Sequence, residues 1–328
     1  MIISRTPFRI SLAGGGSDFG EYYRVNPGAV LTLAIDRYMY VTINKRFDDA
    51  IRVSYTQTEI VSHLADLRHE IIREAMRATG VTSGVEVTTI ADLPAGIGLG
   101  SSSTLTVGVL NALYAYRGKY VSSGELADEA CRIEIDVLGK PIGKQDQYIA
   151  AHGGFQFVSF HPDERVTVTP MSCLPSTTSG LVNRLLLFYT GVQRASESVL
   201  EEAKERIAGR AATREALDDM VGLANDLRAH VAANRIRGVG EGLHRGWTLK
   251  KEMASNVSNP TIDALYSAAL RAGATGGKIA GAGGGGCLLL YAPLRAHRTI
   301  RRAMQRRGLA EIPFSLEPSG TRIIFAGT

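Results

Sequence analysis

Apolar and polar positions alternate along much of the first half of the chain in the pattern that β-strands show. Six segments of that half fit this pattern: residues 2–7, 8–12, 29–35, 38–43, 85–90 and 155–160. In the second half, the apolar runs at residues 185–189 and 287–291 are typical of buried strands. The strands come in groups of the kind that pair antiparallel.

Other segments repeat apolar residues every three or four positions, as amphipathic helices do. They are residues 60–79, 122–138, 195–209, 212–233, 237–254 and 261–271. Gly80 should end the first of these helices, and Ser122 or Ser123 should cap the second, with Glu125 in its first turn. Because the helices lie between groups of strands rather than after every strand, the pattern predicts an α+β fold.

A chain of 328 residues is typical of two domains. Residues 161–180 hold prolines and several Ser and Thr without strong periodicity, so the boundary should fall there. We therefore expect one domain over residues 1–170 and a second over residues 171–328.

The composition, with 45% hydrophobic and 21% charged residues, is ordinary for a globular protein. The net charge of +5 is traced mostly to residues 295–307, whose arginines have the spacing of a solvated helix face without the interleaved aromatics of a nucleic-acid surface. No segment approaches the ~20 apolar residues that a membrane span needs. Cys131, Cys173 and Cys287 show no metal-ligand spacing, and without a signal peptide they favour a cytoplasmic protein.

Residues 94–104, Pro-Ala-Gly-Ile-Gly-Leu-Gly-Ser-Ser-Ser-Thr, say most about function. Glycines at alternate positions leave backbone N–H groups bare, and the apolar run that follows predicts a helix. Such a loop suits phosphate binding, and one of its hydroxyls could contact Mg²⁺. The Gly-Lys-Ser/Thr of a P-loop is absent, and Ser103 replaces the third glycine of a dinucleotide fingerprint. Taken alone, the segment could equally be a serine-capped turn before a structural helix.

Two carboxylates downstream of this loop could take part in chemistry. Asp146, beside Lys144, suits a general base or a group that orients a hydroxyl, although a solvated aspartate that caps a helix would look the same. Glu134 lies among apolar residues of a predicted helix. It could be a surface residue or, in a phosphoryl-transfer enzyme, a Mg²⁺ ligand.

Three further features allow a structural and a functional interpretation. Arg9 alternates with apolar residues on a predicted strand, where it could be exposed or could neutralise charge during a transfer reaction. Asp18 follows a glycine turn and could cap a short helix or accept hydrogen bonds from sugar hydroxyls. Residues 281–286 include four consecutive glycines, whose entropic cost favours close approach to a ligand or to another backbone.

Three glycine motifs in this order resemble those of the GHMP kinases, the superfamily of galactokinase, homoserine kinase, mevalonate kinase and phosphomevalonate kinase. The motifs are residues 5–18 (RTPFRISLAGGGSD), 94–103 (PAGIGLGSSS) and 278–287 (KIAGAGGGGC). The resemblance implies two domains, the first like ribosomal protein S5 domain 2 and the second ferredoxin-like. It also implies that ATP lies in the cleft between them.

The resemblance also implies roles for individual residues. Ser102 and Glu134 match ligands of Mg²⁺, Asp146 matches the catalytic aspartate, and Arg9 matches the arginine beside it. Asp18 matches a ligand of the sugar hydroxyls. The residues implied to bind the nucleotide are Pro94, Gly96, Gly98, Gly100, Ser101, Ser102 and Ser103, and those implied on the substrate side include Gly15, Gly16, Gly283 and Gly284.

Within the superfamily the chain looks most like the D-glycero-D-manno-heptose 7-phosphate kinases, over its whole length. This similarity implies an ATP- and Mg²⁺-dependent kinase that phosphorylates the anomeric hydroxyl of the heptose 7-phosphate, for the synthesis of nucleotide-heptoses. Lys250, Lys251 and Arg194 are candidates to bind the 7-phosphate because of their charge and their place near the matching segments. Ser17 stands where a threonine is usual and Cys287 where an aromatic is common, so the identity of the sugar stays open.

Three alternatives remain beside this assignment. The protein could be a 1-kinase for an unphosphorylated sugar such as fucose, galactose or a hexosamine, or a non-catalytic sugar sensor on the same scaffold. The presence of Ser102, Glu134 and Asp146 argues against a sensor, and the broken fingerprint argues against a dinucleotide-dependent oxidoreductase. The expected partners are ATP and a small sugar phosphate, without nucleic acid or membrane, and the enzyme could act as a homodimer.

Overall fold

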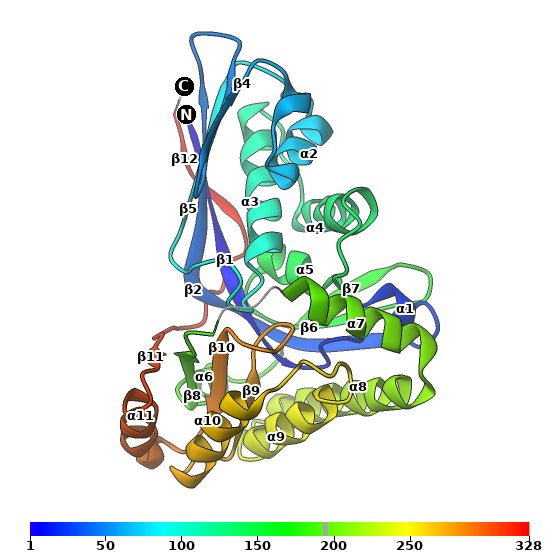
Figure 1. The fold of residues 1–328 in the computed structure, drawn as a ribbon, viewed down its shortest axis with the longest axis vertical. Coiled ribbons are helices and arrows are strands. Elements are labelled where there is room, and N and C mark those ends of the chain that lie inside the picture. The colour runs from blue at the N-terminus through cyan, green and yellow to red at the C-terminus, as the bar shows by residue number, and fades with distance from the viewer. Residues whose placement is uncertain (193–195, 328) are drawn as a thin grey trace.

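The computed structural model describes residues 1–192 and 196–327, which form an elongated molecule with one β-sheet in each of two parts (Figure 1). Within these residues the first sheet has eight strands: β1 (Ile2–Ala13), β2 (Gly28–Lys45), β3 (Ile51–Ser54), β4 (Thr58–Val61), β5 (Val85–Ala91), β6 (Phe155–Phe160), β7 (Val166–Pro170) and β12 (Arg322–Ala326). Their order is β12-β1-β2-β5-β3-β4, and β6 pairs with β2 and β7. All pairs are antiparallel except β3 with β5.

Helices cover one face of this sheet (Figure 1). The helical segments of the first part are α1 (Gly20–Tyr23), η1 (Leu64–Asp66), α2 (Glu70–Thr79), α3 (Ser101–Tyr116), α4 (Ser123–Cys131), η2 (Arg132–Val137) and α5 (Gln145–His152). Helix α3 lies against β1 and β2, and its Leu110 and Leu113 share a buried core with Val41 and Ile43 of β2. This packing fixes the N-terminus of α3 at the end of the sheet that faces the second part.

The second part has an antiparallel sheet in the order β11-β8-β10-β9. Its strands are β8 (Leu185–Tyr189), β9 (Gly276–Ile279), β10 (Cys287–Tyr291) and β11 (Ala310–Glu311). Its helical segments are α6 (Pro175–Val182), α7 (Ser196–Gly209), α8 (Ala211–Ala232), α9 (Val239–Lys250), α10 (Pro260–Arg271), η3 (Leu294–Ala296) and α11 (His297–Gln305). A continuous core joins the two parts, because Phe8 and Leu33 of the first sheet pack with Leu227, Leu243 and Leu289 of the second part. The walls of a pocket between the parts are therefore held by buried side chains on both sides.

The predicted strands of the first half are present, but four of them merge into two. Residues 2–7 and 8–12 form the single strand β1, and residues 29–35 and 38–43 both lie in β2. The register of β1 against β2 shifts between Pro7 and Phe8. Since proline has no N–H to donate to the ladder, an irregularity at this point lets one long strand pass through it.

The predicted helix over residues 60–79 is only half correct. The structure has β4 and the short η1 first, and α2 begins at Glu70. The cause is Glu59, which is 5% exposed and accepts hydrogen bonds from the backbone nitrogens of Arg68 (2.7 Å) and His69 (3.2 Å). These bonds fix a turn where the periodicity alone favours a helix. The predicted end at Gly80 is confirmed, because Gly80 caps α2 in the left-handed conformation.

The predicted helix over residues 122–138 begins as expected and changes its winding before it ends. Ser122 caps α4 and forms a reciprocal capping box with Glu125. At Arg132 the chain continues as the π-helical segment η2, which carries Glu134. Such local widening of a helix is frequent at functional sites.

The expected division at residue 170 needs one correction. Strand β12, near the end of the chain, pairs with β1 in the first sheet, so the segment 171–328 does not lie wholly in the second part. The pairing gives hydrogen-bond partners to the backbone groups at the edge of β1. No local pattern in residues 322–326 reveals this pairing.

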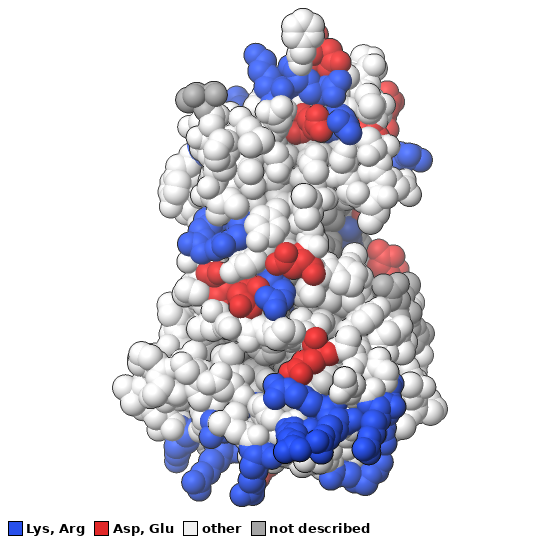
Figure 2. Space-filling model, turned by 90° about the vertical axis from the view of Figure 1, so that its left-hand side faces the viewer, with Lys and Arg blue, Asp and Glu red and all other residues white. Residues whose placement is uncertain are grey.

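The basic segment 295–307 lies on and around α11. Its arginines (Arg295, Arg298, Arg301, Arg302, Arg306 and Arg307) are exposed, as predicted for a solvated helix face, whereas His297 is buried. Figure 2 shows Lys and Arg side chains gathered at the lower end of the molecule, the end to which α11 belongs.

Candidate active site

The glycine-serine loop ends at the N-terminus of α3, where it borders a pocket between the two parts. Gly100 is the N-cap residue of α3, and no side chain caps the first turn. The N–H groups of that turn are therefore available to an anion, and the helix dipole favours negative charge there. The residues of this segment that line the pocket are Gly96, Gly98, Gly100, Ser101, Ser102 and Ser103.

The second and third glycine motifs touch each other through bare backbone. A Cβ atom on Gly98 would lie 2.4 Å from the carbonyl oxygen of Ala280, and one on Gly281 would lie 2.5 Å from the Cα of Gly98. Gly98 also has a φ of +83°. This contact explains why both motifs need glycine, and it holds the loop against the second part of the molecule.

Replacement of Gly98 by Ala is expected to destabilise the fold by about 2 kcal/mol, because a Cβ would collide with backbone and φ would be strained. The matched control is Gly96→Ala, since Gly96 has a similar φ of +77° but open space around the Cβ position. That variant should lose only about 1 kcal/mol through strain. Urea unfolding of both variants measures the difference. Equal losses in the free energy of unfolding would show that the close contact with Ala280 does not add to the cost of the Gly98 substitution.

Arg9 and Asp146 form a bidentate ion pair in the lining of the pocket. Arg9 donates from Nε to Oδ1 (2.6 Å) and from Nη2 to Oδ2 (2.7 Å) of Asp146, and from Nη1 to the carbonyl of Gly98 (2.8 Å). Arg9 is 4% exposed, so it is not the surface residue that an arginine on a strand would be by default. Asp146 lies in the first turn of α5 and faces Arg9 rather than capping the helix. Lys144, its neighbour in sequence, instead pairs with Glu164.

Glu134 is a fully buried carboxylate beside the serines of the loop. It accepts hydrogen bonds from Oγ of Ser102 and from Nε2 of Gln147 (2.8 Å). Burial raises the pKa of Glu134, and the hydrogen bonds from Ser102, Ser103 and Gln147 oppose that rise. A buried carboxylate and a serine hydroxyl next to an anion site are hard oxygen donors of the kind that Mg²⁺ prefers, so these residues fit the ion that the family implies.

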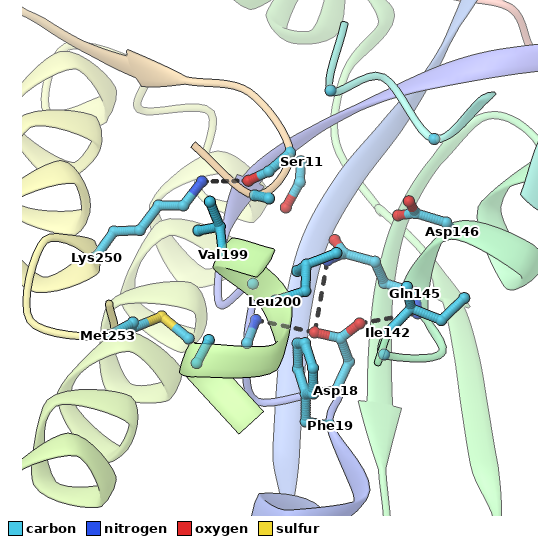
Figure 3. Close-up of a pocket in the computed structure, with 18 of the residues that line it drawn as sticks. Ser11, Asp18, Phe19, Ile142, Gln145, Asp146, Val199, Leu200, Lys250 and Met253 are labelled. Atoms are coloured by element: carbon cyan, nitrogen blue, oxygen red, sulfur yellow. Dashed lines mark hydrogen bonds between the residues drawn. The ribbon is translucent and has the colours of Figure 1, made fainter. Parts of the chain in front are cut away.

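Asp18 is a buried residue of the pocket lining and connects the first motif to α5 (Figure 3). Its carboxylate accepts the N–H of Gly16 (2.9 Å) and the N–H of Gln145 (3.1 Å), the first residue of α5. It therefore does not cap α1, which has no side-chain cap. Burial is the main cause of the raised pKa of Asp18.

The pocket brings most of the residues expected at the site together, but not all of them. Gly15, Gly16 and Lys250 line it, in addition to Arg9, Asp18, Asp146 and the loop residues described above. Residues that do not line it are Pro94, Glu134, Gly283, Gly284 and Lys251, although Glu134 accepts a hydrogen bond from the lining residue Ser102. Lys251 pairs with Asp263 at the surface, and Gly284 donates its N–H to the carbonyl of Val257. Arg194 lies outside the described residues.

Three polar residues line the pocket without having been expected there: Ser11, Gln145 and Lys278. Ser11 follows Arg9 by two positions on β1, so the alternation of a strand places it on the same face, and this signal was present in the sequence. Gln145 depends on where α5 begins, and Lys278 depends on the packing of β9 against β1. Lys278 opens the third glycine motif, but the motif gave its side chain no role, and no local pattern marks Gln145.

The comparisons with known proteins agree with this geometry. The GHMP kinase N-terminal domain model matches residues 66–154, and the GHMP kinase C-terminal model matches residues 220–310. A D-glycero-alpha-D-manno-heptose 7-phosphate kinase of Campylobacter jejuni is 30% identical over 98% of both chains. The bifunctional fucokinase/GDP-fucose pyrophosphorylase of Arabidopsis thaliana is 26% identical over 87% of this chain and 29% of its own length. The crystal structure of a D-glycero-D-manno-heptose 1-phosphate kinase from Bacteroides thetaiotaomicron is similar over the whole of both chains, with a TM-score of 0.83 and 25% identity.

A two-part α+β fold with a glycine loop at a helix N-terminus and a buried carboxylate beside it is an arrangement that suits a phosphotransferase. The chain belongs to the GHMP kinases. It is therefore a sugar kinase of this family that uses ATP as the phosphoryl donor, and the resemblance inferred from the three motifs is confirmed. Among the helices of the described residues, none is long and apolar enough to cross a membrane.

Proposed function

We propose that this kinase transfers the γ-phosphoryl group of ATP to the anomeric hydroxyl of D-glycero-D-manno-heptose 7-phosphate and forms the 1,7-bisphosphate. The observation that carries the reaction type is the Arg9–Asp146 pair, which faces the same pocket as the uncapped N-terminus of α3. The choice of sugar is supported by the Campylobacter jejuni relative, which matches the chain over nearly its full length. The product would serve nucleotide-heptose synthesis for surface glycans.

In the proposed reaction the sugar oxygen forms a bond to the γ-phosphorus while the bond from that phosphorus to the β,γ-bridging oxygen breaks. ADP leaves with that oxygen, and the hydroxyl proton passes to the carboxylate of Asp146. Arg9 holds this carboxylate in one orientation through two hydrogen bonds, so the acceptor meets a positioned base. Asp18 and Gln145 lie beside it and can orient the other hydroxyls of the sugar.

Ser102 and Glu134 would hold Mg²⁺ at the nucleotide side of the pocket. The ion, when bound, offsets the negative charge of the triphosphate. Without it, Glu134 is a buried carboxylate that accepts hydrogen bonds from the neutral donors Ser102 and Gln147. This is an arrangement that a cation stabilises.

We expect the affinity for Mg²⁺ to fall as the pH is lowered. The raised pKa of Glu134 means that a proton competes with the ion at a higher pH than for an ordinary glutamate, whose pKa is near 4.5. Calorimetric titration of Mg²⁺ into the complex with a non-hydrolysable ATP analogue, between about pH 8 and pH 5.5, measures the effect. Glu134→Gln should bind the ion more weakly and lose this pH dependence, whereas an unchanged profile in that variant would exclude Glu134 as a ligand.

A coupled ADP-release assay with heptose 7-phosphate, fucose and galactose tests the proposed substrate. We expect turnover with the heptose phosphate and little with the free sugars. Turnover of a free sugar with none of the heptose phosphate would contradict the proposal and favour the unphosphorylated-sugar kinase suggested by the similarity to the plant fucokinase.

A further inference from the structure

Two buried lysines line the pocket without a carboxylate partner. Lys250 at the end of α9 is 9% exposed, and Lys278 on β9 is 5% exposed. Among the described residues, neither forms an ion pair. Lys250 donates from Nζ to the carbonyls of Ile279 (3.2 Å) and Gly281, and Lys278 donates to the carbonyl of Leu12 (3.3 Å). Since an ammonium has three donors, each lysine keeps at least one for a ligand.

These lysines come from separate elements of the second part, and a third polar group of the same pocket comes from the first part. Ser11 of β1 is 7% exposed and lines the same pocket, and its Oγ is buried without a hydrogen-bond partner. Figure 3 shows Lys250 across the pocket from Asp146, with Ser11 between them in this view. A buried hydroxyl that has no hydrogen-bond partner costs free energy. A ligand in this part of the pocket could supply the missing donor or acceptor.

The charge of this cluster is unfavourable in the ligand-free protein. Burial lowers the pKa of Lys278 to about 7, with Arg9 adding to the shift, and burial lowers the pKa of Lys250 as well. Packing alone would be served better by methionine or leucine at both positions, because a buried ammonium without a counter-charge is costly. An anionic ligand would supply the missing counter-charge.

Other residues of the pocket form the expected place of the nucleotide phosphates. The uncapped turn of α3 and the Ser102–Glu134 pair lie on the wall that carries the glycine-serine loop. Arg9 lies close enough to both lysines for its charge to lower their pKa values, but its own charge is matched by Asp146. Lys250 and Lys278 therefore add positive charge to this cavity that no carboxylate of the described residues matches in an ion pair.

We propose that Lys250, Lys278 and Ser11 form an anion subsite that binds the phosphomonoester group of the acceptor sugar. This inference rests on the proposed function and adds the residues that would distinguish a sugar phosphate from a free sugar. An acceptor held at both ends would present its anomeric hydroxyl to Asp146 while its phosphate contacts the two lysines.

The test is steady-state kinetics of Lys278→Met and Lys250→Met with heptose 7-phosphate, free heptose and ATP as varied substrates. We expect the KM for heptose 7-phosphate to rise about 10- to 100-fold, as the loss of a charge-assisted hydrogen bond predicts. The KM values for ATP and for free heptose should change less than about threefold. Lys119→Met is the control, because Lys119 is exposed in the turn after α3 and should leave all three constants unchanged.

A parallel rise in the KM for ATP would overturn the proposal, since it would assign the lysines to the nucleotide. An equal rise in the KM values for heptose 7-phosphate and for free heptose would overturn the proposal as well. If the wild-type enzyme uses only free sugars, the proposed substrate and the subsite both fail. If the wild type uses heptose 7-phosphate and the variants bind it normally, the subsite alone fails.

A binding measurement on the wild-type protein keeps the proposal testable even if a variant does not fold. Without nucleotide, heptose 7-phosphate should raise the Tm more than the same concentration of free heptose. In Lys278→Met this difference should disappear, and the ligand-free Tm should stay the same or rise because a buried charge is removed. Equal stabilisation of the wild type by both sugars would contradict the subsite.

Discussion

Asp146→Asn is expected to lower kcat by about 10³-fold, because the variant keeps the shape of the side chain but cannot accept the proton of the sugar hydroxyl. Asp146 lies in the same pocket as the anion loop, and Arg9 contacts both of its carboxylate oxygens. Asparagine retains one of these acceptors, so the KM values for ATP and for the sugar should change only a few-fold. Rapid-quench measurement of a single turnover checks the chemical step directly.

This variant also distinguishes an enzyme from a sugar sensor on the same scaffold. A sensor would bind sugar and ATP equally well with either residue and would show no transfer with either. A kcat within about threefold of the wild type would contradict the assignment of Asp146 as the catalytic base.

Arg9→Met is expected to lower both activity and stability. The variant leaves Asp146 without its ion-pair partner and the carbonyl of Gly98 without its donor. Removing one member of a buried pair costs several kcal/mol, and because the Asp146 side chain is 22% exposed we expect about 3 kcal/mol. With the base and the loop no longer aligned, kcat should fall about 10²-fold.

Arg301→Met provides the matched control, because Arg301 also contacts both carboxylate oxygens of one acid, Glu311, but its side chain is 50% exposed. Its loss should cost less than about 1 kcal/mol in urea unfolding and leave kcat unchanged. Equal destabilisation by the two substitutions would show that burial of the Arg9 pair does not matter.

Local patterns predicted the secondary structure well where neighbouring residues decide it. The capping box of Ser122 and Glu125 and the cap at Gly80 follow from side-chain chemistry within one turn. The fusion of the first strands into β1 and β2 and the return of β12 to the first sheet depend on partners far along the chain. Periodicity carries no information about such pairings.

The same limit applies to the candidate site: the sequence indicated individual residues but not the contacts between them. Arg9 and Ser102 lie in the glycine motifs, and the resemblance to the family implied roles for Asp146 and Glu134. No spacing could reveal that Arg9 contacts both Asp146 and Gly98. The sequence could not show which of Lys250 and Lys251 reaches the pocket, because both are lysines and they are neighbours in the chain. Neighbours on a helix point about 100° apart, so one reaches the pocket while the other pairs with Asp263 at the surface.

The most direct test of the central claim is phosphorus NMR of the product formed from ATP and heptose 7-phosphate. If Asp146 activates the anomeric hydroxyl, the new phosphate resonance should be split by coupling to the anomeric proton, and Asp146→Asn should not form it at a measurable rate. A new phosphate on any other carbon, or consumption of ATP without a new sugar phosphate, would contradict the proposed function.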